Sequence, residues 1–470
     1  MRIYNTMSRK KEELKTLTPN EIKIYACGPT VYNYIHIGNA RPMCVFDVLR
    51  RYLEYKGYKV YFMQNFTDID DKIINKALEE NVSFKDISEK FIFEYKIDSK
   101  GLNIKKPTYE PRATENIDHI IKIVSGLIDK GFAYENNGDV FFRVKKYDNY
   151  GALSNTKMED LEAGARIDVN NQKEDPLDFV LWKKAKDNEP YWQSPWGRGR
   201  PGWHIECTAM INKVFGSTID IHCGGQDLIF PHHENEIAQS VCFTGKPYVN
   251  YWMHNGYINV DNKKMSKSEG NFFTVRDVAE KFGYETIRFM MLQVHYRSPI
   301  NYSYDIMTQC KASLERIKNC KISLERAKKY SSKNDIEINE KDTEKLNKFR
   351  EEFIKVMDDD LNTADAISVI FELVTEINKN IMNKKEISEE YLNLSKQIFD
   401  ELTGVLGILY DDSSKKTEEI NEEIKNLLNE RETARKEKNF KKADEIRDEI
   451  ISRGYILEDT PSGAVIKLKN

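Results

Sequence analysis

The sequence predicts an α/β fold: a Rossmann-like domain with a parallel sheet and an insertion, followed by an α-helical bundle and a small mixed α/β C-terminal domain. Three observations predict it. A strand–turn–helix pattern lies near the N-terminus, a second one surrounds residue 225, and purely helical periodicity begins after residue 300. In open parallel sheets such turns lie at the edge where ligands bind. We therefore expect the functional site between the two turns.

The first strand–turn–helix pattern follows a polar lead-in, residues 1–20, which we expect to be extended or an edge strand. Alternating apolar residues end at a break around Gly28, and a helix is predicted over residues 40–56. His36 and Gly38 stand just before that helix. Free backbone N–H groups and the helix dipole favour an anion there, so this turn is a candidate phosphate site.

The exit of the second predicted strand, residues 58–66, carries polar side chains. Thr67 follows the strand, and then come Asp68, Asp70 and Asp71. These groups are expected at the ligand-binding edge of the sheet. For each aspartate the alternative is capping of the helix that follows at residues 73–80.

A polar excursion over residues 110–200 is predicted to split the two halves of the sheet. It contains a predicted helix at 117–130 and a predicted strand at 138–144. Its end, residues 198–202, reads as a flexible cationic loop. That loop either contacts phosphate or is a plain solvent loop, and the sequence leaves both open.

The second turn follows a predicted strand over residues 219–223. Gly224 and Gly225 let a ligand approach the backbone closely, and Asp227 follows them. A helix is predicted to begin near Pro231. Residues 251–260 read as one further strand, whose glycine at 256 offers a place for adenine against the main chain.

Beyond the sheet, residues 305–410 are predicted to be helical, with buried positions repeating at steps of four and three. Residues 411–419 form a charged linker. One basic helix follows, and then a strand over residues 464–468. The lysines and arginines of that helix either contact nucleic-acid phosphates or form a solvated face; they are Arg435, Lys436, Lys438, Lys441 and Lys442.

Composition limits the class of protein. The formal net charge of -4 excludes a polycation, so any nucleic-acid contact must use a local basic face. Seven cysteines and no apolar leader predict reduced thiols and a cytoplasmic protein. No apolar run is long enough to span a bilayer, so no membrane partner is expected.

A metal site is the third candidate feature. His232 and Glu236 are four residues apart, so a helix would place them on one face. Cys27 and Cys207 stand near the proposed sheet edge, and two thiolates, an imidazole and a carboxylate suit zinc. From the residues alone the choice stays open, because other donors compete for the same role: His222, Cys223, His233 and Glu234.

Two short motifs indicate a family. Residues 36–39, HIGN, resemble the HIGH signature of class I aminoacyl-tRNA synthetases, and residues 264–268 are the full KMSKS signature. Residues 27–32, CGPTVY, make the first signature resemble that of the cysteinyl-tRNA synthetases in particular. Asn39 departs from the last letter of HIGH. The resemblance covers nearly the whole chain, and the two signatures stand in the order and separation of the family.

The resemblance implies three domains. The class I catalytic domain would span residues 1–300, with a connective insertion at about 110–200 that can hold the acceptor end of tRNA. A helical domain on the stem and anticodon side would span 301–410, and a small anticodon-recognition domain 420–470. The implied enzyme is an ATP-dependent cysteine–tRNA ligase, a cytoplasmic monomer whose partners are tRNA(Cys), L-cysteine and ATP.

The resemblance also selects the metal ligands. Residue by residue, the family's zinc positions fall on Cys27, Cys207, His232 and Glu236. Zinc would bind the substrate thiolate and so separate cysteine from serine, which a pocket of ordinary contacts discriminates only weakly. The implied contacts to the rest of the amino acid are Gly28, Thr67 and Trp203.

For ATP, which is expected with magnesium, the resemblance assigns three groups of residues. His36 would donate to the phosphates, and Lys264 and Lys267 would close over the triphosphate and stabilise the transition state. Asp227 would bind the ribose hydroxyls. The remaining nucleotide contacts would be Gly38, Asn39 and Gly256.

Two other functions fit parts of the pattern. A ligase of the mycothiol pathway would share the catalytic half and the zinc but join cysteine to an amino sugar, with little use for the chain beyond residue 310. A non-enzymatic RNA-binding paralogue would have lost one of the catalytic or zinc residues. His36, Lys267 and the four metal ligands are all present, which argues against the paralogue.

Overall fold

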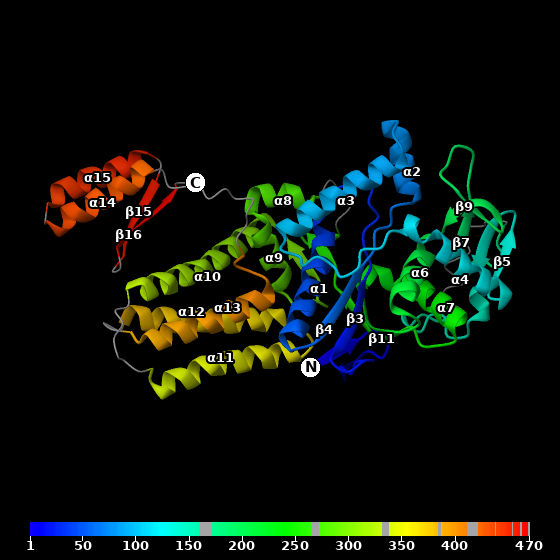
Figure 1. The fold of residues 1–470 in the computed structure, drawn as a ribbon, viewed down its shortest axis with the longest axis horizontal. Helices are drawn as coiled ribbons and strands as arrows, with labels where there is room; N and C mark the ends of the chain where they lie inside the picture. Colours follow the sequence, from blue (N-terminus) through cyan, green and yellow to red (C-terminus); the bar gives the residue numbers. More distant parts are fainter. Residues whose placement is uncertain are drawn as a thin grey trace.

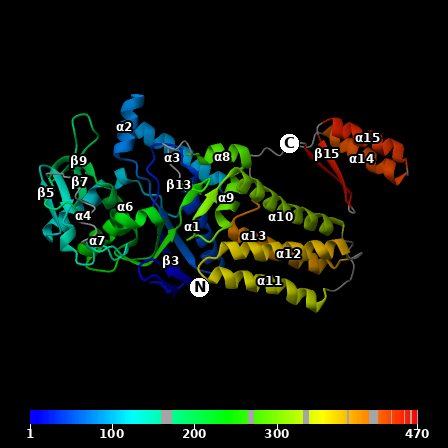
Figure 2. The same ribbon diagram turned by 180° about the vertical axis from the view of Figure 1, so that it is seen from behind.

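The structure is a computed structural model, and Figure 1 shows its fold. It describes residues 1–158, 172–264, 272–330, 338–383, 387–410, 422–437, 439–453, 455–460 and 463–468. In both views the five-stranded sheet of the insertion lies at one side of the central parallel sheet, and the helices α10–α13 lie at the other (Figures 1 and 2).

The central sheet is parallel, in the order β11-β10-β3-β4. Its strands are β3 (Glu21–Ala26), β4 (Lys59–Gln64), β10 (Ile219–Gly225) and β11 (Val249–Asn255). The middle pair, β3 and β10, comes from the two halves of the chain that the insertion separates. The chain winds outward from this pair in both directions, so the carboxyl ends of β3 and β10 form the switch point of the fold, where ligands bind.

Helix α1 (Ile37–Tyr55) packs next to this sheet and buries twelve of its nineteen residues. It begins three residues earlier than the predicted helix, with His36 as its N-cap. The polar lead-in forms a hairpin of two short strands, β1 (Arg2–Asn5) and β2 (Lys10–Glu13). Asn5 at the end of β1 donates to the Asn250 carbonyl, which fixes this hairpin beside β11.

The insertion contains a five-stranded antiparallel sheet in the order β5-β6-β7-β9-β8. Its elements are α4 (Ile117–Asp129), β5 (Ala133–Asn136), β6 (Asp139–Phe142), η2 (Val144–Lys146), β7 (Phe179–Lys184), β8 (Trp192–Ser194) and β9 (Gly197–Pro201), preceded by η1 (Ala113–Asn116). The predicted flexible loop at 198–202 is wrong, because these residues pair as β9. Arg200 is buried and forms an ion pair with Asp71, so its charge is not available to a phosphate.

Two other sequence predictions need correction. The single strand predicted over 251–260 is β11 followed by β12 (Ile258–Val260), because the chain turns at Gly256 to meet β14 (Ile300–Tyr302). The single basic helix near the C-terminus is two helices, α14 (Glu422–Lys436) and α15 (Phe440–Ser452). They precede the hairpin of β15 (Tyr455–Thr460) and β16 (Gly463–Leu468), of which only the second strand was predicted.

The remaining helices surround the sheet or form the bundle. Those of the sheet domain are α2 (Asp71–Glu80), α3 (Phe84–Gly101), α6 (Trp203–Phe215), α7 (Glu234–Thr244), α8 (Val275–Phe282) and α9 (Tyr284–Leu292), with η3 (Gln226–Leu228), η4 (Ile229–His233) and the short strand β13 (Lys263–Lys264). The bundle consists of α10 (Tyr304–Tyr330), α11 (Glu340–Asp358), α12 (Thr363–Asn383) and α13 (Glu389–Leu406). The helical character predicted for 305–410 is present throughout the part described.

All seven cysteines lie in the described part of the chain and are free thiols. Among the described residues, no helix is both long enough and apolar enough to cross a bilayer.

A buried charge network joins α1 to the bundle. Asp47 on α1 accepts from Arg288 Nη2 at 2.6 Å and from Arg51 Nε at 2.6 Å. Arg288 also donates to the Leu406 carbonyl at the end of α13. Burial opposes the Asp47 charge, but the two guanidinium groups outweigh it and lower the pKa of this carboxyl.

We expect Arg288→Met to be one of the most destabilising single changes in the sheet domain. The change leaves the Asp47 charge buried with one partner fewer, which should lower the free energy of unfolding by about 3–5 kcal/mol. Lys311→Met is the control, a change of an exposed cation on α10 for which less than about 0.5 kcal/mol is expected. Urea unfolding would measure both. Because the pKa of Asp47 is lowered, the difference should be present at neutral pH and shrink as pH falls through that pKa. Equal stability of the two variants would contradict this.

Candidate metal centre and nucleotide cleft

Four side chains from four parts of the chain meet at the switch point of the sheet. Cys27 follows β3, Cys207 lies on α6, His232 on η4 and Glu236 on α7. His232 Nε2 is 3.5 Å from the Cys207 sulfur and 3.2 Å from Glu236 Oε1, which is 3.8 Å from the Cys27 sulfur. One ligand atom of each lies within 4.8 Å of the others, so the four can hold one metal ion.

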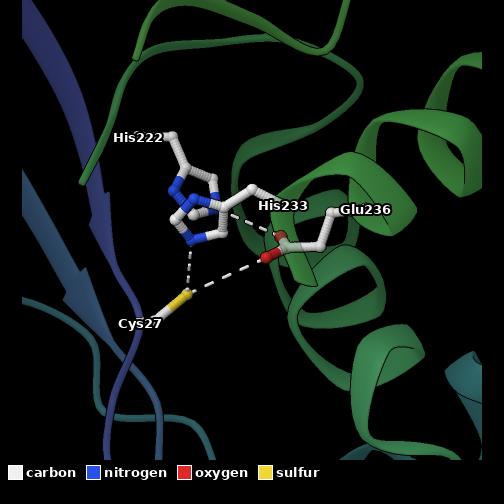
Figure 3. Close-up of side chains that lie close together, drawn as sticks. All are labelled: Cys27, His222, His233 and Glu236. Carbon is white, nitrogen blue, oxygen red and sulfur yellow. Dashed lines mark hydrogen bonds and ion pairs between the residues drawn. The ribbon is translucent and has the colours of Figure 1, made fainter. Parts of the chain in front are cut away.

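A second set of donors shares two members with the first. Cys27 and Glu236 also lie with His222 and His233 (Figure 3). His233 Nε2 is 3.3 Å from the Cys27 sulfur, and His222 Nε2 is 3.0 Å from Glu236 Oε2. Tyr248 donates to the same Oε2 at 2.8 Å. Because His222 and Tyr248 bind one carboxylate oxygen, the other is left to face Cys27 and His232.

The remaining two competitors predicted from the sequence lie outside both sets. Cys223 is buried within β10, and burial raises the pKa of its thiol well above the usual range. Glu234 accepts from the Ser154 backbone N–H at 2.9 Å and so fixes a loop of the insertion.

The electrostatics of the first set favour a cation. A hydrogen bond from Cys27 and the nearby His232 lower the pKa of Cys207 to about 6. Burial disfavours the His232 charge, but Cys207 and Glu236 outweigh it and raise the pKa of this imidazole to about 10. Burial also opposes the Glu236 charge, yet His222 and His232 lower the pKa of that carboxyl to about 2. The pKa of Cys27 is raised by burial.

The side chains of His204 and Trp203 orient His232. Its Nδ1 lies 2.9 Å from His204 Nδ1, which leaves Nε2 facing Cys207 and Glu236. The Trp203 ring packs against His232 at a centroid distance of 4.3 Å, with the two rings tilted by 35°. Trp203 is 41% exposed although it stands beside a buried centre. A hydrogen-bond partner on the second nitrogen is typical of metal-binding histidines.

A cleft of about 570 Å³ opens beside the metal centre, and Cys27 and Trp203 form part of its wall. The cleft also contains six residues that the sequence predicts for the substrates: Gly28, His36, Gly38, Asn39, Asp227 and Gly256. They come from the segments that follow β3, β10 and β11, including the first turn of α1, which the parallel topology brings to one edge. Thr67 and Cys207 are buried.

The first signature, residues 36–39, forms the N-cap and the first turn of α1. Asn39 Oδ1 accepts from the His36 backbone N–H at 3.1 Å, as the third residue of a capping box does. Asn39, the letter that departs from HIGH, therefore fixes the backbone of His36. The His36 ring also meets the Phe272 ring at 5.2 Å.

The segment after the second signature lies against the first. The Ile37 N–H donates to the Phe273 carbonyl at 3.0 Å, and His36 pairs with Thr274 in an isolated bridge. Lys264 ends the short strand β13. Lys267 lies outside the described residues, as do the other residues from 265 to 271.

The three predicted edge aspartates have structural partners. Asp70 caps α2 through the Lys72 N–H, and Asp68 accepts from Thr114. Asp71 pairs with Lys183 and Arg200 of the insertion. Helix capping, the alternative considered for each, thus holds for Asp70.

Sequence reasoning missed Arg41, which positions the predicted adenine site. Its buried guanidinium donates to the carbonyls of Gly256 and Tyr257 at 3.1 and 2.9 Å, and to those of His295 and Ser298. A single arginine thus fixes the turn between β11 and β12. Its place five residues after His36, in an otherwise apolar stretch of helix, was the only signal.

Comparison with known proteins identifies the chain. Residues 13–312 match the model of the tRNA synthetases class I (C) catalytic domain, 352–410 the DALR domain, and 417–464 the cysteinyl-tRNA ligase anticodon binding domain. A cysteine–tRNA ligase of Clostridioides difficile (strain 630) is 53% identical over 468 residues, 98% of this chain and 99% of the relative. This chain belongs to the cysteine–tRNA ligase family. A second member, from Caldicellulosiruptor saccharolyticus, is 52% identical over 99% of both chains.

The fold of this chain is similar to that of solved aminoacyl-tRNA synthetases. The methionyl-tRNA synthetase of Mycobacterium tuberculosis in complex with methionyl-adenylate matches with a TM-score of 0.62 at 16% identity. The match covers 82% of this chain and 89% of that one. The fold class predicted from the sequence is confirmed.

Proposed function

We propose that the chain is a cysteine–tRNA ligase, which activates L-cysteine with ATP to cysteinyl-adenylate and pyrophosphate and then transfers cysteine to the 3′-terminal adenosine of tRNA(Cys). The observation that carries this is the thiol-rich centre beside the nucleotide cleft. Cys27 belongs to both, so an amino acid can reach the centre with its side chain and the cleft with its carboxylate. The anticodon-domain match at 417–464 favours tRNA over the amino-sugar acceptor of the alternative ligase.

The metal we assign is one zinc ion held by Cys27, Cys207, His232 and Glu236. Two thiols, an imidazole and a carboxylate are a donor set that suits zinc, and their ligand atoms already lie together. Zinc would supply a position that prefers a thiolate to a hydroxyl and thereby selects cysteine over serine. The set with His222 and His233 has one thiol only, and we assign it the supporting role that its hydrogen bonds to Glu236 and Cys27 describe.

The other groups of the amino acid meet Gly28, Thr67 and Trp203. Gly28 lets the loop after β4 pack closely against the turn after β3, since a Cβ there would lie 1.6 Å from the Asn65 carbonyl oxygen. Trp203 is partly exposed and lines the cleft beside Cys27. A substituted Gly28 would displace the loop after β4, which carries Thr67.

ATP lies along the cleft, with magnesium bound mainly through phosphate oxygens and water. His36 and the N-terminus of α1, with Gly38 and Asn39, bind the phosphates. Asp227 accepts from the ribose hydroxyls, and adenine lies at Gly256. Lys264 and Lys267 meet the charge that develops in the transition state. The cysteine carboxylate is already a nucleophile, so positioning and charge stabilisation suffice without a general base.

For the domains we propose a catalytic domain over residues 1–300 with the insertion at 110–200 on the acceptor end, a stem-side bundle over 301–410, and an anticodon domain over 420–470. The enzyme acts as a cytoplasmic monomer.

The decisive experiment is charging of transcribed tRNA(Cys) with cysteine and with serine, with the metal content assayed on the same preparation. Charging with cysteine alone and about one zinc per chain is expected; equal charging with serine would refute the proposal.

Zinc uptake by the metal-free protein should release protons. At pH 7 the metal-free centre holds protons on Cys27, whose pKa is raised, and on His232, whose pKa is about 10, while Cys207 is largely ionised with a pKa of about 6. Ligands bind zinc in their deprotonated forms, so about two protons should leave per zinc. Zinc affinity should therefore fall as pH falls. Calorimetric titration in buffers of different ionisation enthalpy measures the number, and a value of zero would contradict the assignment.

A further inference from the structure

A buried carboxylate of the helical bundle reaches the segment that packs against the turn at Gly256. Asp360 lies between α11 and α12, inside the match to the DALR domain, and is fully buried. Its Oδ1 accepts from the Tyr296 hydroxyl at 2.8 Å, and its Oδ2 accepts from Arg297 Nε at 2.8 Å. Oδ1 also accepts from the Tyr4 backbone N–H at 2.8 Å. One side chain of the bundle thus holds two neighbouring residues of the sheet domain.

The same two residues contact the nucleotide cleft through their backbone. The Gly256 N–H donates to the Tyr296 carbonyl at 2.8 Å. A Cβ on Gly256 would lie 2.8 Å from the Arg297 carbonyl oxygen, so the two backbones are in close contact. Gln226, the neighbour of Asp227, donates to the same Arg297 carbonyl at 3.4 Å. These two residues therefore connect the bundle to both turns that the adenosine part of ATP is proposed to meet.

We propose that Asp360 is a positioning residue for ATP, which acts by holding the segment 295–298 against the adenine turn, although Asp360 itself does not line the cleft. This rests on the proposed place of adenine at Gly256. The donors on Asp360 include a backbone N–H and a guanidinium, which can only donate, so both of its oxygens are needed as acceptors. Because Gly256 is in close contact with the segment, a shift of the segment displaces the adenine turn. Arg41 also holds this segment, so we expect a shift and not its unfolding.

The test compares ATP with two probes that each carry part of it. Adenosine reaches only the adenine and ribose turns, and inorganic triphosphate reaches only the phosphate groups at the N-terminus of α1. In full-length protein, Asp360→Asn should raise KM for ATP and weaken adenosine by about 10-fold, within the range for residues of one hydrogen-bond network. The cause is that asparagine keeps one acceptor oxygen but turns an NH₂ toward Arg297 Nε.

The other parameters of this variant separate positioning from a general loss of structure. Binding of inorganic triphosphate, KM for cysteine and kcat should stay within about 2-fold, because adenine is bound equally in the ground state and in the transition state. Cysteine-dependent ATP–pyrophosphate exchange gives kcat and both KM values, and competition in the same assay gives the affinities of the two probes.

Asp178→Asn is the matched control. Asp178 is also a buried carboxylate that accepts from a tyrosine hydroxyl and a backbone N–H, those of Tyr134 and Val144. It lies in the insertion, so this change should lower the melting temperature without raising KM for ATP. If Asp360→Asn does not fold, Tyr296→Phe replaces it, because it removes one hydrogen bond to Asp360 and keeps the ring. It should weaken ATP and adenosine by about 3-fold and leave inorganic triphosphate unchanged.

Gly256→Ala separates a failure of this inference from a failure of the adenine site. Its Cβ would meet the Arg297 carbonyl oxygen, so it should by itself raise KM for ATP and weaken adenosine. A wild-type KM for ATP in Asp360→Asn when Gly256→Ala raises it, or equal losses for adenosine and inorganic triphosphate, would overturn the inference. A wild-type KM for ATP in Gly256→Ala would refute the adenine site and with it the inference. Absence of cysteine-dependent exchange in the wild-type protein would instead refute the proposed function, so the failures are distinguishable.

Discussion

Cys207→Ser is expected to remove stoichiometric zinc and, with it, cysteine activation, while ATP binding largely remains. The buried Cys207 sulfur lies 3.5 Å from His232 Nε2, and a hydroxyl in its place is a poor ligand for zinc. Loss of a metal ligand, or of the contacts that support it, lowers the affinity for the metal by roughly 10- to 100-fold or more. Metal analysis of the purified variant and cysteine-dependent ATP–pyrophosphate exchange measure the two effects.

Cys242→Ser is the control for the change of a buried thiol. Cys242 is buried on α7 but belongs to neither set of metal donors. Its variant should keep zinc and exchange activity near the wild-type level. Wild-type zinc content in Cys207→Ser would remove Cys207 from the ligand set and leave the set with His222 and His233 as the metal site.

Lys267→Ala should lower cysteine-dependent ATP–pyrophosphate exchange by about 10²- to 10³-fold, because groups that stabilise developing charge have effects of this size. The expected loss is in kcat, since the lysine meets charge that appears only in the transition state. Binding of ATP at equilibrium should change much less. The assignment rests on the KMSKS motif and on the segment directly after it, which pairs with His36 through Thr274.

Lys263→Ala is the matched control for Lys267. It is exposed on β13, one residue before the motif, and has the same charge. Its exchange rate should stay close to that of the wild type. Exchange by Lys267→Ala at the wild-type rate would remove the transition-state role and leave His36 and the α1 N-terminus as the groups that stabilise the phosphates.

The sheet and its turns were predictable because local patterns specify them. The breaks at Gly28 and Gly225 mark the ends of β3 and β10, and parallel strands bring such ends to one edge. The turn at Gly256 was missed, because strand-forming residues resume directly after it at Tyr257 and Ile258. β9 was predicted as a loop for a similar reason: its glycines and arginines are typical of a loop, and its pairing with β7 and β8 is a long-range property.

The sequence by itself determined the family, the fold class and the residue types of the site, since the two signatures and the strand–turn–helix patterns are local. Only the tertiary structure decided which donors lie together. Cys27, Cys207, His232 and Glu236 are up to 209 residues apart, and their meeting depends on how β3, α6 and α7 pack.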